Sequence, residues 1–168
     1  AKTLPRMAPK SEVESIFQSI NALLLPGVTM AIGGRVDLQT LLLQRALRAN
    51  QAGDFFAVWG TCKGYETLLE IVGGGHVLNY GYDAVDFATS LELTSASPGR
   101  MLAGANATLL EWASTQPITY NNHGVGITPA HLAAHSKLSS FFNVLGVSTD
   151  RRGRRMVDRQ GRTELWPF

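Results

Sequence analysis

The stretch FFAVWGTCKGYE, residues 55–66, decides the fold. Its apolar first half has the composition of a buried β-strand, and the residues after Gly64 have a helical pattern. Between them, the turn Gly60–Gly64 places Cys62 with a glycine two positions away on each side. This layout is typical of a nucleophile elbow, in which a strand runs through a sharp turn into a helix. The glycines allow the turn and keep other side chains away from the nucleophile.

Two interpretations of Cys62 remain open on spacing alone. At the N-terminus of a helix the dipole favours the thiolate, which is the nucleophilic form of the side chain. The alternative is a buried structural cysteine in a strand–helix turn, because free cysteines are usually core residues. Cys62 is the one cysteine of the sequence, so no internal disulfide is expected.

Strands and helices alternate through the first half of the chain. Residues 22–25 form a short apolar run that ends at a proline–glycine turn, and a helical stretch separates it from the strand at 55–59. This alternation predicts an α/β fold with a parallel sheet and helices on both faces. We expect the two strands to be adjacent, so that their C-terminal ends bring Gly27 and Cys62 together, because ligands of open α/β sheets bind there.

The pattern changes in the second half. Short strands with polar turns are expected from Val77 to Leu93, followed by helices over 107–115 and 128–140, the second capped by Thr128. Further strands are expected at 142–148 and 154–157. Because no repeat, low-complexity tract or linker interrupts the chain, the sequence predicts a single domain over residues 1–168.

The net charge of the chain is small and does not indicate a nucleic-acid partner. Fifteen basic and thirteen acidic residues give a formal net charge of +2. Arginines nevertheless crowd the C-terminal end, at Arg151, Arg152, Arg154, Arg155, Arg159 and Arg162. A solvated hairpin is the simpler interpretation, and an anion-binding patch is the alternative. No run of eighteen apolar residues occurs, so the sequence predicts no membrane span.

Four segments together resemble the γ-glutamyl hydrolases, members of the class I glutamine-amidotransferase-like group. Residues 58–66 (VWGTCKGYE) resemble the family's nucleophile turn, and residues 19–27 (SINALLLPG) its strand and oxyanion loop. Residues 121–129 (NNHGVGITP) resemble its substrate-site histidine segment, and residues 138–145 (LSSFFNVL) the segment that follows. They occur in the family's order and at about its spacing. The resemblance implies a three-layer α/β sandwich with a mostly parallel central sheet.

A thiol hydrolase without a cofactor is the activity that the resemblance implies. Cys62 would attack the carbonyl of a γ-glutamyl amide and form a thioester, which water then cleaves. Backbone N–H groups of Lys63 and of the turn at Gly27 and Val28 would hold the oxyanion. The family's usual substrates are folate and antifolate poly-γ-glutamates.

The resemblance also points to substrate-binding residues. His123 matches a histidine that the family places at the substrate site, and Asn122 beside it is a further candidate; an ordinary loop histidine is the alternative. Glu66 matches a carboxylate position next to the active-site turn, or else it complements the helix dipole. His131 and His135 have a spacing that can bind metal, but no zincin pattern accompanies them, so no metal site is expected.

The sequence departs from the family pattern in three places. Val28 stands where the family often has a second glycine, and Lys63 stands where an apolar residue is common. The family's general base is a histidine in a Gln-Trp-His-Pro-Glu segment, and this sequence reaches residues 165–168 (LWPF) just before that point. These 168 residues lack the family's N- and C-terminal segments. We therefore expect them to be the middle of a longer polypeptide. We expect no turnover from these 168 residues alone.

Three functions follow from these considerations. The first is a γ-glutamyl peptide hydrolase acting on poly-γ-glutamates. The second is a non-catalytic member of the family with a structural role in a larger assembly, which the missing base would fit. The third is a glutaminase that passes ammonia to a synthase, since it uses the same elbow. The sequence leaves open a homodimer or a larger assembly, and by analogy the family suggests a lysosomal, vacuolar or secreted location.

Overall fold

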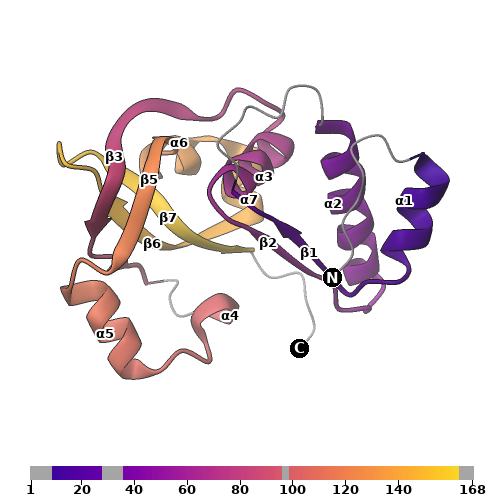
Figure 1. The fold of residues 1–168 in the computed structure, drawn as a ribbon, viewed down its shortest axis with the longest axis horizontal. Coiled ribbons are helices and arrows are strands. Elements are labelled where there is room, and N and C mark those ends of the chain that lie inside the picture. Colours follow the sequence, from indigo (N-terminus) through magenta and orange to yellow (C-terminus); the bar gives the residue numbers. More distant parts are fainter. Residues whose placement is uncertain (1–8, 28–35, 96–98, 163–168) are drawn as a thin grey trace. The chain divides into compact units, whose positions relative to one another are not determined.

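The computed structural model describes residues 9–27, 36–95 and 99–162. The chain forms two compact units, one over the residues up to Ile71 and one from Val72 to Glu164. Helices alternate with strands in the first unit, whereas antiparallel strands dominate the second (Figure 1). The expected α/β class is confirmed at this level.

The first unit is built around a pair of parallel strands. Its elements are α1 (Lys10–Phe17), β1 (Ala22–Leu25), α2 (Val36–Gln51), β2 (Ala57–Gly60) and α3 (Lys63–Gly73). β1 and β2 pair in parallel, with Ala22 opposite Ala57 and Leu25 opposite Gly60. The prediction of two adjacent parallel strands is confirmed, although β2 begins two residues later than the sequence suggested.

Asn50, near the end of α2, explains where β2 begins. Its buried side-chain amide donates to the carbonyl of Phe56 at 2.8 Å and accepts from the Phe56 amide at 2.6 Å. The backbone of Phe56 is thus occupied by a side chain, so strand pairing starts at the next residue. The Phe56 ring also stacks on Phe17 of α1, with 4.5 Å between ring centroids. These contacts anchor the segment that leads to the candidate elbow.

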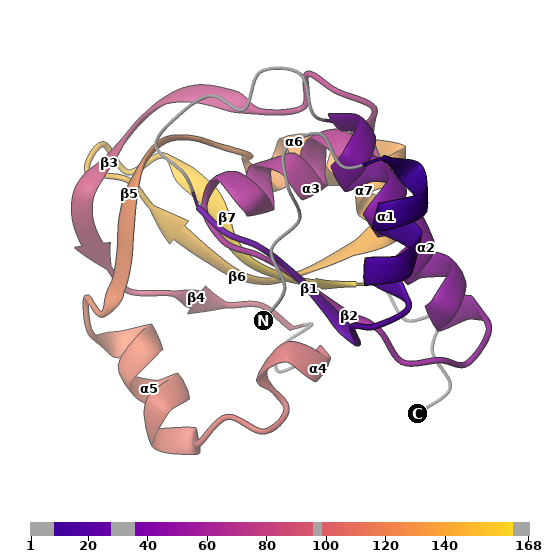
Figure 2. The same ribbon diagram turned by 45° about the vertical axis from the view of Figure 1, so that its right-hand side comes forward.

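The second unit is mainly antiparallel. It contains β3 (Asn79–Thr89), β4 (Glu92–Leu93), α4 (Gly99–Leu102), α5 (Ala107–Thr115), β5 (Thr119–Gly126), α6 (Pro129–Ala134), α7 (Ser136–Phe141), β6 (Phe142–Thr149) and β7 (Arg155–Arg162). β3 pairs with β5, and β6 lies between β4 and β7 (Figure 2). Its core is apolar, with Ala84, Ile127, Leu138, Leu145 and Met156 at most 1% exposed.

Two expectations for the second unit were wrong in detail. The helix expected over 128–140 is two short helices, because His135 adopts an extended conformation (φ −91°, ψ 102°) between them. The cap at Thr128 is confirmed, since its hydroxyl accepts from the His131 amide at 3.1 Å. The short strands expected after Val77 include one long strand, β3, whose two register shifts against β5 break the alternation of a regular strand.

Strand direction follows the order of elements along the chain. A helix separates β1 from β2, which allows the parallel pairing, whereas β6 and β7 follow each other through a short turn and pair antiparallel. Among the described strands, β1 and β2 are therefore the one parallel pair. The three-layer sandwich and the single domain over residues 1–168 stay predictions. None of the described helices is long and apolar enough to cross a membrane.

Candidate active site

Cys62 lies at a sharp turn between β2 and α3. β2 ends at Gly60 and α3 begins at Lys63, so two residues join them. The backbone of Cys62 has φ 52°, in the left-handed region that costs a non-glycine residue about 1–2 kcal/mol. The residue is exposed and its sulfur is a free thiol. A strained, exposed cysteine between a strand and a helix has the backbone geometry of a nucleophile elbow.

Close packing of glycines holds this turn. A Cβ on Gly64 would lie 1.9 Å from the carbonyl oxygen of Leu25, and one on Gly60 would lie 2.9 Å from the backbone carbonyl carbon and oxygen of Gly64. Both distances are too short for real atoms, so α3 can approach the strands this closely only with glycine at these positions. The glycines were expected to allow the turn, and the structure gives them a second role in the packing of α3.

The end of β1 lies against the elbow. The Thr61 amide donates to the carbonyl of Leu25 at 3.0 Å, which continues the strand pairing into the turn. Two residues farther along, a Cβ on Gly27 would lie 2.9 Å from Cys62 Cβ and 3.6 Å from Cys62 Sγ. The prediction that the strand ends bring Gly27 and Cys62 together is confirmed. Val28, the other residue expected in the oxyanion turn, lies outside the described residues.

Lys63 and Glu66 form an ion pair in the first turn of α3. Lys63 Nζ lies 2.8 Å from Glu66 Oε2, and the Glu66 side chain is only 9% exposed. The Glu66 amide donates to the Cys62 carbonyl at 3.0 Å, which closes the first helical turn on the cysteine. Glu66 is therefore buried, charge-paired and within one turn of the nucleophile. This position suits either of the two roles left open by the sequence, which are substrate binding and complementation of the helix dipole.

His123 and Asn122 lie on β5, in the second unit. His123 is opposite Ala84 of β3 in the strand register. Its Nε2 lies 3.0 Å from Asn121 Oδ1, whereas the Asn122 side chain accepts from the Asp86 amide at 3.2 Å. The partner of His123 is thus Asn121, which the sequence analysis missed. The two-residue alternation of side chains along a strand could have found it, because residues 121 and 123 share a face.

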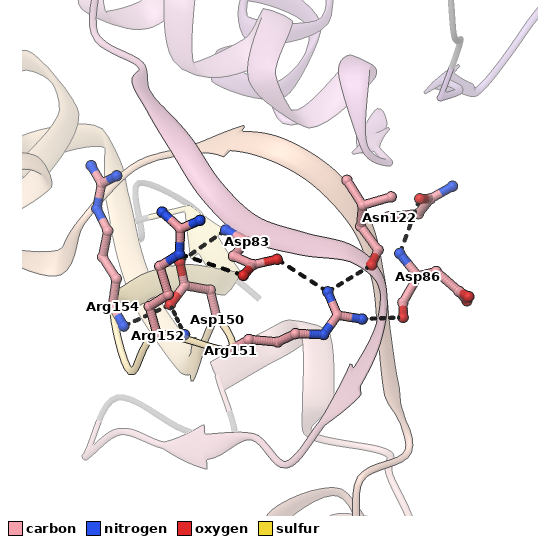
Figure 3. A network of polar contacts seen from close by, with 8 residues as sticks. Asp83, Asp86, Asn122, Asp150, Arg151, Arg152 and Arg154 are labelled. Carbon is pink, nitrogen blue, oxygen red and sulfur yellow. Dashed lines mark hydrogen bonds and ion pairs between the residues drawn. The ribbon is translucent and has the colours of Figure 1, made fainter.

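An arginine on the β6–β7 turn braces the irregular part of β3, where Asp86 has φ 49° (Figure 3). Arg151 donates to the carbonyl of Val85 at 2.9 Å and to that of Asp86 at 2.6 Å. It also pairs with the Asp83 carboxylate at 3.3 Å. This segment of β3 pairs with the part of β5 that carries Asn121, Asn122 and His123.

Asp150 organises the same turn (Figure 3). Its carboxylate accepts from the amides of Asp83 at 3.0 Å, Arg152 at 2.9 Å and Arg154 at 2.8 Å. Burial alone would raise the pKa of Asp150, but these three amides and the Arg152 charge outweigh it and hold the pKa below its usual value. Two of the C-terminal arginines have packing roles besides solvation: Arg151 holds a neighbouring strand, and Arg154 lies over the Tyr82 ring at 4.1 Å.

His131 of α6 and His135, which follows this helix, do not form a metal centre in the described part of the chain. His131 Nδ1 lies 3.3 Å from Asn79 Oδ1, which also accepts from the Thr128 amide. Within residues 9–27, 36–95 and 99–162, no group of three or more histidine, cysteine, aspartate or glutamate side chains could hold a metal ion. The contact of His131 instead ties α6 to the start of β3.

The predicted site residues thus fall in the two units. Cys62, Gly27, Lys63 and Glu66 lie together in the first, and His123 and Asn122 lie on one strand of the second. Each group has an ordered local geometry. The roles assigned to these residues stay predictions.

Comparison with known proteins identifies relatives of the chain. No family model matches it. It is 32% identical over 150 residues to "Gamma-glutamyl hydrolase" of Homo sapiens, covering 84% of this chain and 45% of that protein. "Gamma-glutamyl hydrolase B" of Dictyostelium discoideum is 29% identical over 153 residues, with 85% and 42% covered. "Gamma-glutamyl hydrolase 1" of Arabidopsis thaliana is 28% identical over 162 residues, with 94% and 46% covered. The chain spans somewhat less than half the length of these curated relatives.

Proposed function

We propose that this chain, which belongs to the γ-glutamyl hydrolase family, carries the nucleophile of a thiol hydrolase that cleaves γ-glutamyl bonds. The observation that carries the proposal is the elbow: an exposed Cys62 at φ 52°, with Gly27 against its side chain. An ordinary structural cysteine needs neither the strained backbone nor the exposure. The names of the relatives indicate the bond that is cleaved.

The reaction would proceed through a thioester. The Cys62 thiolate attacks the carbonyl carbon of the γ-glutamyl amide, and a C–S bond forms as the carbonyl oxygen becomes an oxyanion. The C–N bond then breaks, and the amine leaves with a proton from a histidine acid. Water next attacks the thioester and gives its proton to the same histidine. The C–S bond breaks, which releases the γ-glutamyl acid and restores the thiolate.

Backbone amides next to the elbow would stabilise the oxyanion. The Lys63 amide follows the nucleophile directly, and the turn after β1 supplies the second donor, at Gly27 or Val28. The closeness of Gly27 to Cys62 supports this assignment, since both donors must lie near the attacked carbonyl. The acid–base histidine would be that of the family's Gln-Trp-His-Pro-Glu pattern, which does not occur within residues 1–168.

Glu66, His123 and Asn122 would bind the substrate. Glu66 is already paired with Lys63, so this pair offers both a carboxylate and an ammonium within a helical turn of the nucleophile. Such a pair suits the amino and carboxylate groups of a glutamyl residue. Folate poly-γ-glutamates are the substrates that the family suggests, and a net charge of +2 would not repel them.

Turnover of a poly-γ-glutamate tests the proposal. The complete protein is incubated with a pteroyl poly-γ-glutamate, and released glutamate or γ-glutamyl peptides are separated by chromatography. Wild type should release product, and Cys62→Ala should release none above background. A folded wild type that carries the histidine and is no faster than Cys62→Ala would favour the non-catalytic member of the family. Release of ammonia from glutamine, without cleavage of the poly-γ-glutamate, would favour the glutaminase.

A further inference from the structure

Asn121 and His123 form a side-chain pair on one face of β5. They are two residues apart on a strand, so their side chains point the same way. His123 Nε2 lies 3.0 Å from Asn121 Oδ1, a distance typical of a hydrogen bond.

Thr119 fixes the direction of this hydrogen bond. Asn121 Nδ2 lies 3.2 Å from the carbonyl oxygen of Thr119, which can only accept. The amide nitrogen must therefore face Thr119, and the amide oxygen must face the ring. Because an amide oxygen also only accepts, the hydrogen lies on His123 Nε2. Asn121 is 4% exposed, so its burial keeps the amide in this orientation.

The other ring nitrogen of His123 is left for a ligand. Nδ1 is buried and has no hydrogen-bond partner among the residues that the structure describes. A buried nitrogen without a partner is costly, and a hydrogen bond from a ligand would remove that cost. His123 as a whole is half-buried, whereas Nδ1 itself is covered, so contact between a ligand and Nδ1 requires a small local movement.

We propose that Asn121 is a positioning residue that keeps the hydrogen on His123 Nε2, so that Nδ1 is the atom that meets the substrate. In a neutral ring, Nδ1 accepts from an N–H group of the γ-glutamyl chain. In a protonated ring, Nδ1–H donates to one of its carboxylates. Asn121 is compatible with both states and excludes the neutral form with the hydrogen on Nδ1. The substrate half of this inference rests on the proposed function, and the hydrogen-bond half does not.

Nitrogen-15 NMR of the ring tests the hydrogen-bond half without any activity. At a pH at which the ring is neutral, His123 should show a protonated Nε2 and an unprotonated Nδ1, with an Nε2 proton protected from exchange. Asn121→Leu should remove that protection. Asn122→Leu changes the same residue type on the opposite face and should leave the His123 pattern unchanged. A hydrogen on Nδ1 in wild type, or protection that survives Asn121→Leu, would overturn the assignment.

Kinetics of the complete protein test the substrate half. Asn121→Leu should raise KM for a poly-γ-glutamate about tenfold, with a smaller change in kcat, since one hydrogen bond to substrate is weakened. Asn121→Asp keeps an acceptor for Nε2–H and should recover most of the loss. If the NMR pattern holds and KM does not move, Nδ1 does not meet the substrate. If wild type does not turn over at all, the proposed function fails while the NMR result still decides the role of Asn121.

Discussion

The elbow and the braced part of β3 hold the same unfavourable backbone conformation in different ways. Cys62 has φ 52° and Asp86 has φ 49°, and neither is glycine. At the elbow, the backbone is held by a helix packed against strands through Gly60 and Gly64. At β3, it is held by polar contacts from Arg151 to backbone carbonyls. The two regions should therefore respond to different substitutions and to different solution conditions.

The backbone at Cys62 is restrained by close packing, and the backbone at Asp86 is restrained by polar contacts. Close packing tolerates no added atom, but it does not depend on the charge of a side chain. A polar brace tolerates changes of volume, but it weakens when a donor or a carboxylate charge is lost. Substitutions can break each restraint separately, and the expected effects fall in the order that follows.

Gly64→Ala should have the largest effect. Its Cβ would lie 1.9 Å from the Leu25 carbonyl oxygen, so α3 or β1 must move, at a cost of about 3 kcal/mol or more in unfolding free energy. Denaturant unfolding measures this cost. Gly53→Ala is the matched control, because Gly53 has φ 85° and nothing within 4 Å, so it should lose only about 1 kcal/mol of backbone energy. Equal losses in the two variants would contradict steric restraint at the elbow.

Arg151→Met should have an intermediate effect. It keeps the aliphatic stem and removes the donors to Val85 and Asp86, which should cost about 2 kcal/mol, because both carbonyls lose a charged partner. Arg152→Met is the control: Arg152 is 75% exposed with one ion pair at 3.5 Å, so its loss should stay within about 0.5 kcal/mol. Hydrogen exchange of the β3 amides should rise in the first variant alone. A similar rise in both would remove the special role of Arg151.

Acid should loosen the braced region. The pKa of Asp150 is lower in the folded chain than its usual value near 3.8, so its carboxylate stabilises the fold above that value. This contribution is lost as the pH falls through the lowered folded pKa. In wild type, the protection of the β6–β7 turn amides from hydrogen exchange should fall below about pH 4, and in Asp150→Asn this protection should depend less on pH. An unchanged pH dependence would show that another group controls the turn.

Relief of the strained backbone should give the smallest effects. At φ near 50°, glycine is favoured over alanine by about 1 kcal/mol, so Cys62→Gly should be more stable than Cys62→Ala by that amount. The same comparison at Asp86 should give a similar difference. Thermal unfolding of the four variants measures both. A difference near zero at position 62 would mean that the elbow relaxes when the cysteine is removed.

The sequence predicted the elbow well because its signals are local. A strand pattern, glycines on both sides of Cys62 and a helical pattern occur within residues 55–66, and they require the turn that the structure shows. The approach of Gly27 to Cys62 also followed from a simple rule on parallel strand ends. The ion pair of Lys63 and Glu66 was not predicted, although their i, i+3 spacing on a helix allows it.

The braced region could not be predicted in the same way. Arg151 lies 65 residues from Asp86 in the sequence, and no local pattern indicates that it donates to that carbonyl. The bulges of β3 hide its length, since they break the alternation by which a strand is recognised. The contact of Asn121 with His123 is the exception, since the alternation along β5 places both side chains on one face. Long-range polar contacts and irregular strands are thus where pattern reasoning stops.

Trapping of the acyl-enzyme tests the central claim most directly. The complete protein is mixed with a poly-γ-glutamate, quenched in acid within the first turnovers, and digested for mass spectrometry. The account predicts a γ-glutamyl group in thioester linkage on the peptide that contains Cys62, and its absence in Cys62→Ala. Product release without any adduct on Cys62, or equal product release by wild type and Cys62→Ala, would contradict the claim that this cysteine is the nucleophile.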